Sequence, residues 1–320
     1  MEQSRRLNIV KALCIILMVV GHSDPPTGLH GFIYLFHMPA FFFLSGYLFK
    51  ESWLDRPGGF IKKRLGTLYA PYVFWELVFL LLGGLFFRLH LADTQLTGCE
   101  MLSQAFKYIT FRGHQPLLNG YWFLKTLFFC STGCFFVLKL FPRKPAILAA
   151  WIAGLLAAAG CCRLVPFDTT MISRLLLACA FYLSGFLFAR FRREIPLSVA
   201  LAAMAAVAVI SLFWRETIFV DGWGVLLYYP VALLGIIGIF GIAAVLDRWD
   251  PVARFLDFTG RATLTILTFH FLGFRLVSLL NIHSWLLYSL AGIALPLLVY
   301  LLYNSCGHPS GSRKFPVKLF

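Results

Sequence analysis

The sequence predicts an all-α protein in which about ten helices cross a membrane and both termini lie in the cytoplasm. Hydrophobic residues make up 60% of the 320 residues and charged residues only 13%, whereas soluble domains carry about a quarter charged residues. Apolar runs long enough to span a bilayer recur along the chain. Finally, the 28 lysines and arginines gather in alternate connecting segments, as the loops on the cytoplasmic side of a membrane protein do.

Each apolar run of about 17–25 residues indicates a spanning helix, because lipid offers no hydrogen-bond partner to free backbone groups. The predicted spans are 7–23, 30–50, 67–92, 120–141, 145–162, 170–190, 195–214, 224–246, 262–281 and 284–303. In the second span we expect Pro39 to bend the helix, because proline leaves the carbonyl of Leu35 without a partner. Gly235, Gly238 and Gly241 predict close helix packing in the eighth span. We therefore predict one transmembrane domain over 1–303 and a cytoplasmic tail over 304–320.

The distribution of charge predicts which side of the membrane each loop occupies. Ten spans leave both termini on one side, and most basic residues lie in the segments of that side. The basic residues of the opposite loops are Arg88, Lys107, Arg112, Arg163 and Arg215. Because cytoplasmic loops carry an excess of lysine and arginine, both termini are predicted to be cytoplasmic. The net charge of +14 is then mostly a matter of topology, and we expect the lipid bilayer and no nucleic acid as a partner.

The eight cysteines lie mostly inside apolar runs, without the Cys-x-x-Cys or Cys/His spacing that is typical of zinc sites. Cys130 and Cys134 share one face of a predicted helix, and we interpret them as small buried side chains. We expect no metal site.

Charged or titratable side chains inside lipid are costly, so each is a functional candidate. In the predicted spans these residues are Lys11, His22, His37, Glu76, Lys125, Arg174, His270 and Arg275. The direction of each span places His22, His37, Lys125, Arg174 and Arg275 in the outer half of the membrane. This convergence predicts a polar cavity that opens outward. Lys125 and Arg174 have an alternative interpretation, in which their charged ends extend to the membrane surface.

His22 is the best candidate for a reactive base, because a neutral imidazole can take a proton from a hydroxyl at ordinary pH. Lys11 lies on the same helix face, about 16 Å away along the axis. Glu76, the only carboxylate in a predicted span, is a candidate partner for Lys11. The alternative for His22 is a structural histidine that only bonds a neighbouring helix.

Two motifs resemble those of the acyltransferase family 3 membrane proteins, especially the branch of sugar and polysaccharide O-acetyltransferases. They are KALCIILMVVGH over 11–22 and FHMPAFFFLSGY over 36–47. The basic stretch Lys62-Lys63-Arg64 before the third span, the Trp-Phe pair at 122–123, and TLTILTFH over 263–270 resemble later motifs of the family. The resemblance covers residues from about 5 to 300.

The resemblance implies transfer of an acyl group from cytoplasmic acetyl-CoA, or another acyl-CoA, to a hydroxyl of an extracytoplasmic glycan or related sugar-bearing acceptor. It implies a multi-pass enzyme of the bacterial inner (plasma) membrane. His22 is the expected general base, and Lys11 and His37 are further catalytic candidates. Lys62, Lys63, Arg64 and Lys11 are expected to bind the donor. Trp122, Lys125, Arg174, His270 and Arg275 are expected to bind the acceptor.

The alternative function is a transporter or flippase for an anionic or acylated, sugar-bearing substrate. Buried cations suit an anion carrier, but a single carboxylate within the predicted spans disfavours coupling through acidic proton relays.

Overall fold

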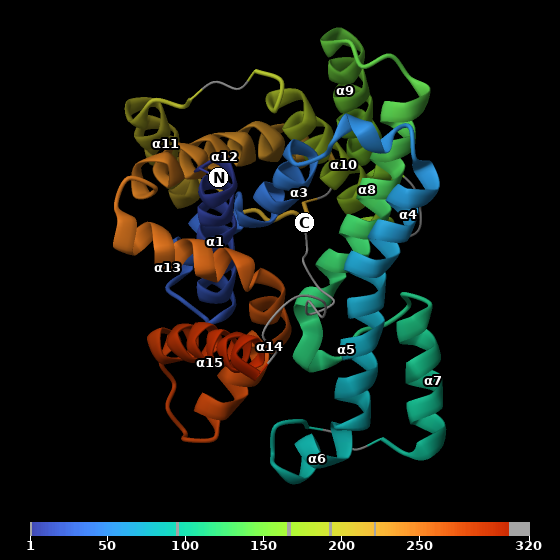
Figure 1. The fold of residues 1–320 in the computed structure, drawn as a ribbon, viewed down its shortest axis with the longest axis vertical. Coiled ribbons are helices and arrows are strands. Elements are labelled where there is room, and N and C mark those ends of the chain that lie inside the picture. The colour runs from blue at the N-terminus through green and yellow to red at the C-terminus, as the bar shows by residue number, and fades with distance from the viewer. Residues whose placement is uncertain (1, 94–95, 165–167, 192–193, 221, 307–320) are drawn as a thin grey trace.

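The computed structural model describes residues 2–93, 96–164, 168–191, 194–220 and 222–306, and within this part of the chain it contains helices and no strand (Figure 1). The α-helices are α1 (Glu2–His22), α2 (Thr27–Tyr34), α3 (His37–Tyr47), α4 (Pro57–Arg64), α5 (Ala70–Leu81), α6 (Gly83–Arg88), α7 (Gly98–Ile109), α8 (Trp122–Leu140), α9 (Pro145–Cys161), α10 (Thr170–Phe188), α11 (Leu197–Phe213), α12 (Val225–Leu246), α13 (Asp250–Arg261), α14 (Thr263–Ser278) and α15 (Trp285–Cys306). Short segments η1 (Glu51–Trp53), η3 (Pro116–Tyr121), η4 (Cys162–Leu164) and η5 (Gly222–Gly224) are 3-10 helices, and η2 (Leu65–Tyr69) is a π-helix.

The prediction of a polytopic helical membrane bundle is confirmed. Six helical stretches of the described chain are long and apolar enough to cross a membrane, and α11 and α14 are shorter apolar helices. Each predicted span contains at least one helix. The predicted end of the domain at 303 falls inside α15, which continues to Cys306, and residues 307–320 of the predicted tail lie outside the described residues.

Two predicted spans are interrupted rather than continuous. The second span breaks between α2 and α3, where Phe36 leaves the helical conformation with φ −144°. This break lies just before Pro39, as expected from a proline that cannot bond the carbonyl of Leu35. The third predicted span breaks at Leu82, between α5 and α6.

Helices α4, α7 and α13 were not predicted, because each is too short and too polar to be recognised as a span. Helix α7 lies within the predicted outer loop 93–119. Its start is fixed by a capping box, in which Thr97 accepts a bond from the Glu100 amide and Glu100 accepts a bond from the Thr97 amide. The hydrogen bonds from Thr97 hold the pKa of Glu100 below its usual range. The two faces of α7 follow a helical period in the sequence, but the helix lies outside the apolar runs from which the spans were predicted.

Glycines set the closest helix contacts. Where α3 and α10 pack, a Cβ on Gly46 would lie 1.8 Å from the Tyr182 carbonyl oxygen, and one on Gly185 would lie 1.9 Å from the Phe43 carbonyl oxygen. Where α11 and α12 pack, a Cβ on Gly241 would lie 2.3 Å from the Cβ of Ala200. The predicted close packing of the eighth span is therefore present, and small residues permit it.

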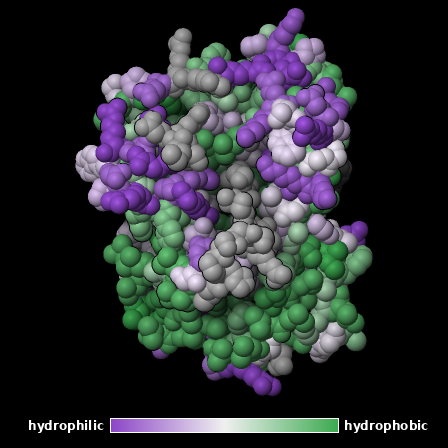
Figure 2. Space-filling view, viewed as in Figure 1, coloured by the Kyte–Doolittle hydropathy of each residue, from purple (hydrophilic) through white to green (hydrophobic). Residues whose placement is uncertain are grey.

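The surface divides into two zones. Figure 2 shows hydrophilic residues over α13 and over α4, in the upper half of the view, and a continuous hydrophobic zone over α15, α14 and α5 below them. A small hydrophilic patch lies at the far end, beside α6. This arrangement suits a bundle whose hydrophobic zone faces lipid.

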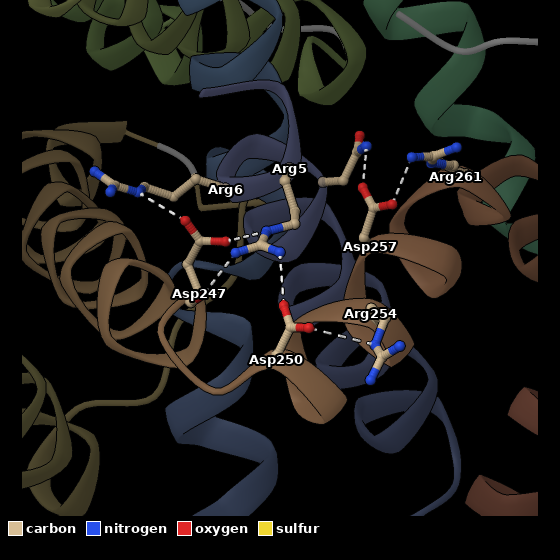
Figure 3. A network of polar contacts seen from close by, with 8 residues as sticks. Arg5, Arg6, Asp247, Asp250, Arg254, Asp257 and Arg261 are labelled. Atoms are coloured by element: carbon tan, nitrogen blue, oxygen red, sulfur yellow. Dashed lines mark hydrogen bonds and ion pairs between the residues drawn. The ribbon is translucent and has the colours of Figure 1, made fainter. Parts of the chain in front are cut away.

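Charged residues from several segments that were predicted to be cytoplasmic meet in one network (Figure 3). Asp247, at the end of α12, accepts bonds from Arg5 Nε at 2.6 Å and from Arg6 Nε at 3.5 Å. Arg5 also pairs with Asp250, and Arg6 with Glu194. The network ties the start of α1 to α12 and α13, and it agrees with the prediction that these segments lie on one side of the membrane.

We expect Asp247→Asn to destabilise the protein by about 1.5–3 kcal/mol, the usual contribution of hydrogen bonds to a charged group. Asp247 is 7% exposed, whereas Asp250 is 65% exposed. The matched variant Asp250→Asn should therefore change stability by about 0–1 kcal/mol. Thermal unfolding of both variants in detergent measures the difference. Equal melting temperatures for the two variants would contradict a stabilising role for the buried carboxylate.

Candidate active site

His22 is the last residue of α1. The helix stops there because Pro25 and Pro26 follow at once and because Asp24 adopts a left-handed conformation with φ 62°, which a helix cannot contain. The turn is held by Ser23, whose hydroxyl donates to the Val20 carbonyl and accepts from Ser289 of α15. Since Arg5 and Arg6 mark the other end of α1, His22 lies at the end of α1 opposite to the charged network.

The half-buried imidazole of His22 lines a cavity of about 730 Å³. The walls come from the end of α1, from α5, α6 and α7, from the loops on either side of α7, and from α14 and α15. Polar side chains in the walls include Asp24, Gln104, His114 and Arg275, and aromatic side chains include Phe79, Phe86, Phe271, Phe274 and Tyr288. The structure thus brings His22 and Arg275 to one cavity.

Two further histidines flank the His22 ring. The His270 ring lies 5.8 Å from the His22 ring between centroids, and Phe271 lies beside both rings. The third histidine, His37, contacts the ring of Tyr34, with centroids 4.9 Å apart, and Tyr34 in turn contacts His22 at 5.9 Å. His22, His37 and His270 are therefore neighbours in space, although only His22 and His37 were predicted to lie in the outer half of the membrane.

His37 and His270 are almost fully buried, and in each ring Nδ1 contacts a backbone carbonyl oxygen. His37 Nδ1 lies 2.8 Å from the Ile33 carbonyl oxygen, and His270 Nδ1 lies 3.1 Å from that of Ile266. A carbonyl only accepts, so in both rings Nδ1 carries the proton. His270 Nε2 is buried and has no hydrogen-bond partner among the described residues. Its lone pair is therefore available to a hydroxyl or a water molecule.

Two ionisable groups shape the polar side of the cavity. Arg275 forms an ion pair with Asp93, which lies in the loop after α6, so that this loop is tied to α14. His114 contacts Asn119 at 3.1 Å. Partial burial lowers the pKa of His114, the nearby Lys125 cation acts in the same direction, and the Asn119 contact opposes both. His114 is therefore a neutral side chain in this wall at ordinary pH.

Trp122, Lys125 and Arg174 do not line this cavity. The Arg174 guanidinium lies over the rings of Trp122 and Phe219, at 4.7 and 4.4 Å from the ring centroids. Lys125 Nζ lies 3.5 Å from the carbonyl oxygen of Gly113. Lys125 and Arg174 were predicted to lie at a similar depth to His22, but depth does not fix which side of a helix bundle a residue occupies.

Glu76 meets a different group from the one predicted. Its carboxylate accepts a bond from the Gln115 amide at 2.7 Å, and Lys125 is the cation that acts on it electrostatically. Lys11 is half-buried near the middle of α1, about three turns before His22. Glu76 thus anchors the loop that carries His114 and Gln115 to α5, rather than forming the Lys11–Glu76 pair that we considered.

Lys62, Lys63 and Arg64 form a cluster at the end of α4. Lys62 and Lys63 are exposed, and Lys63 Nζ lies 5.1 Å from the centroid of Trp53. Burial and the neighbouring cations Arg64 and Lys50 lower the pKa of Lys63. Arg64 is buried over Phe60, and its Nε has no hydrogen-bond partner within the described chain. Like charges that repel one another in this way favour binding of an anion.

Cys179 of α10 completes a group with Cys130 and Cys134 of α8, in which the three sulfur atoms lie within 4.8 Å of one another. The sequence predicted the shared face of Cys130 and Cys134 but gave no signal for Cys179, because the contact depends on the packing of α10 against α8. The thiols of Cys134 and Cys179 are directed at helix carbonyls, with Cys134 Sγ 3.7 Å from the Cys179 oxygen and Cys179 Sγ 4.0 Å from the Cys130 oxygen.

Two parts of the site were missed from sequence. One is Tyr34, whose hydroxyl lies 3.0 Å from His22 Nδ1. The other is α7, which presents Met101, Gln104 and Tyr108 to the cavity and Leu102 and Phe106 to the outside. The alternation of these two faces along 98–109 was the only available signal.

The fold and the site define a class: a multi-pass helical membrane protein with an imidazole exposed to a deep cavity at the end of its first helix. A family model described as an acyltransferase domain matches residues 4–304, nearly the whole chain. The chain therefore belongs to acyltransferase family 3, and it is a membrane acyltransferase. No curated protein and no solved structure matches the chain.

Proposed function

We propose that the protein transfers an acetyl group from cytoplasmic acetyl-CoA to a hydroxyl of an extracytoplasmic glycan, in the inner membrane of a bacterium, with His22 as general base. The observation that carries this proposal is the position of the His22 imidazole in the wall of a cavity large enough for a sugar. Membership of an acyltransferase family favours this reaction over a transporter or flippase.

In the proposed reaction, His22 accepts the proton of an acceptor hydroxyl while the hydroxyl oxygen attacks the thioester carbonyl carbon. The new ester C–O bond forms, the C–S bond breaks, and His22 returns the proton to the sulfur of the leaving thiolate. Negative charge develops on the carbonyl oxygen during attack. Arg275, in the same cavity, is a candidate to stabilise that charge, whereas Lys125 and His37 lie behind the wall.

The cavity wall suits a sugar acceptor. Sugars present apolar ring faces and polar edges, and this wall combines the aromatic rings of Phe271, Phe274 and Tyr288 with the polar groups of Gln104 and His114. His270, which was expected to bind the acceptor, is buried and does not line the cavity. Arg174 and Trp122 contact each other and do not line the cavity.

The proposed function is tested by incubating the purified protein with radiolabelled acetyl-CoA and a panel of glucose, N-acetylglucosamine and a bacterial polysaccharide preparation. We expect label in an ester that mild base hydrolyses, together with release of free CoA thiol. Binding of the glycan without consumption of acetyl-CoA would instead indicate the transporter.

On the donor side we expect the double variant Lys62→Gln/Lys63→Gln to raise the KM for acetyl-CoA about tenfold, because each exposed charge pair contributes up to about 1 kcal/mol. Both lysines are exposed, so we expect the variant to fold. The value of kcat is measured together with KM, because a misfolded protein would also lose kcat. High salt should reduce the difference from the wild type. Lys144→Gln, at another exposed lysine, is the matched control. An unchanged KM in the double variant would remove this cluster from the donor site.

A further inference from the structure

The Nδ1 nitrogen of His22 contacts a residue outside the cavity. The Tyr34 hydroxyl of α2 lies 3.0 Å from His22 Nδ1, and Tyr34 does not line the cavity, whereas His22 does. The Nδ1 edge of the imidazole therefore faces α2. Nε2, on the other side of the ring, is the nitrogen left for a substrate.

Only one proton arrangement of this contact leaves Nε2 able to act as a base. If the Tyr34 hydroxyl donates to Nδ1, the neutral ring carries its proton on Nε2 and has no lone pair there. If Nδ1 carries the proton and donates to the Tyr34 oxygen, the Nε2 lone pair is free. The partner of Nδ1 thus decides whether the cavity receives a base or a hydrogen-bond donor.

We propose that Tyr34 is a positioning residue that accepts a hydrogen bond from His22 Nδ1 and thereby presents the Nε2 lone pair of His22 to the acceptor hydroxyl. This inference rests on the proposed function, since it assigns the nitrogen that removes the proton. When Nε2 takes the proton, the Tyr34 oxygen continues to accept from Nδ1 and stabilises the imidazolium. Tyr34 gains no charge and touches no reacting atom.

Tyr34 is well placed for this role because its ring is fixed on several sides. Its ring stacks on His30, with centroids 4.0 Å apart and an angle of 19° between the planes, and it meets His37 edge-on. Its backbone carbonyl accepts a bond from Tyr228 at 3.1 Å. On the α1 side, a Cβ on Gly21 would lie 2.9 Å from the Tyr34 ring, so even a methyl group there would displace it.

The neighbouring histidines follow the same rule by a different means. In His270 the Nδ1 proton is directed at the Ile266 carbonyl, one turn earlier in α14, and in His37 it is directed at the Ile33 carbonyl of α2, across the break between α2 and α3. The Nδ1 of His22 instead meets a side-chain hydroxyl of another helix. In the proposed arrangement the three rings share one tautomer, and only that of His22 depends on a side chain that can be replaced.

The test compares Tyr34→Phe with Tyr229→Phe, whose hydroxyl contacts Ser184 rather than the site. Tyr34→Phe removes one oxygen and keeps the ring that packs on His30 and His37. With radiolabelled acetyl-CoA and the best acceptor of the panel above, we expect kcat to fall about 10–100-fold, the range found for hydrogen-bond partners that orient metal-bound imidazoles, with KM nearly unchanged. Tyr229→Phe should match the wild type. A folded Tyr34→Phe protein with wild-type kcat would overturn the inference.

A second measurement does not depend on the variant. NMR of the wild-type protein with labelled histidine ring nitrogens distinguishes the two tautomers, and the spectrum of His22→Ala identifies the signals of His22. We expect the Nδ1–H form for His22, and observation of the Nε2–H form would overturn the inference even if Tyr34→Phe did not fold. If His22→Ala retained activity, the proposed function would fail, whereas loss of activity in His22→Ala with full activity in Tyr34→Phe would reject only the role of Tyr34.

Discussion

Replacing His22 with alanine is expected to abolish acyl transfer while the protein remains folded. A positioned general base contributes about 10²–10⁴-fold to rate. Among the described residues, the other histidine that lines this cavity is His114, which contacts Asn119. The ring of His22 already borders an open cavity. Its removal therefore enlarges an existing space instead of leaving a new void in the core, so the effect on stability should be small.

His22→Gln and His283→Ala make the result specific. Glutamine keeps a polar side chain of similar reach but has no basic nitrogen, so we expect His22→Gln to be as inactive as His22→Ala. His283 is an exposed histidine between α14 and α15, and its replacement should leave transfer unchanged. The measurement is transfer of label from acetyl-CoA, with melting temperatures recorded for all three proteins. Substantial transfer by folded His22→Ala would rule out His22 as the base.

Much of the fold could be predicted from the sequence because its physics is local. A run of apolar residues in lipid must satisfy its own backbone hydrogen bonds, and a helix does so without reference to the rest of the chain. The proline at 39 predicted the break between α2 and α3 for the same reason. The contact of Arg5 with Asp247 agrees with the charge distribution, which predicted that both segments are cytoplasmic, but the pairing itself was not predicted.

The site could be predicted only in part because it depends on how helices are rotated against one another. Position in a span predicts the depth of a side chain, and His22 and Arg275, which were predicted at similar depth, line one cavity. Lys125 and Arg174 were predicted at the same depth but contact Gly113 and Trp122. Tyr34 carried no signal, since a tyrosine near a membrane surface is commonplace. Its place in the site depends on its contact with His22, twelve residues earlier in the chain.

Replacing Gly185 with alanine is expected to cause the largest loss of stability of the changes considered. The added Cβ would lie 1.9 Å from the carbonyl oxygen of Phe43 and 3.0 Å from the amide nitrogen of Tyr47. A crowded side chain can adopt another rotamer, but here the obstacle is the backbone of α3. The whole helix must move. We therefore expect the free energy of unfolding to fall by at least about 1–3 kcal/mol, the usual cost of overpacking a core.

The matched control is Gly154→Ala in α9. A Cβ at Gly154 has no atom within 4 Å, and the position is exposed within a helix. Alanine there should stabilise the protein by about 0.5–1 kcal/mol, because glycine weakens a helix interior. The same chemical change is thus expected to act in opposite directions at the two sites. Thermal unfolding in detergent measures the stability of both variants, with the loss of monodisperse protein as the signal. Equal melting temperatures for Gly185→Ala and the wild type would show that α3 and α10 do not pack through this contact.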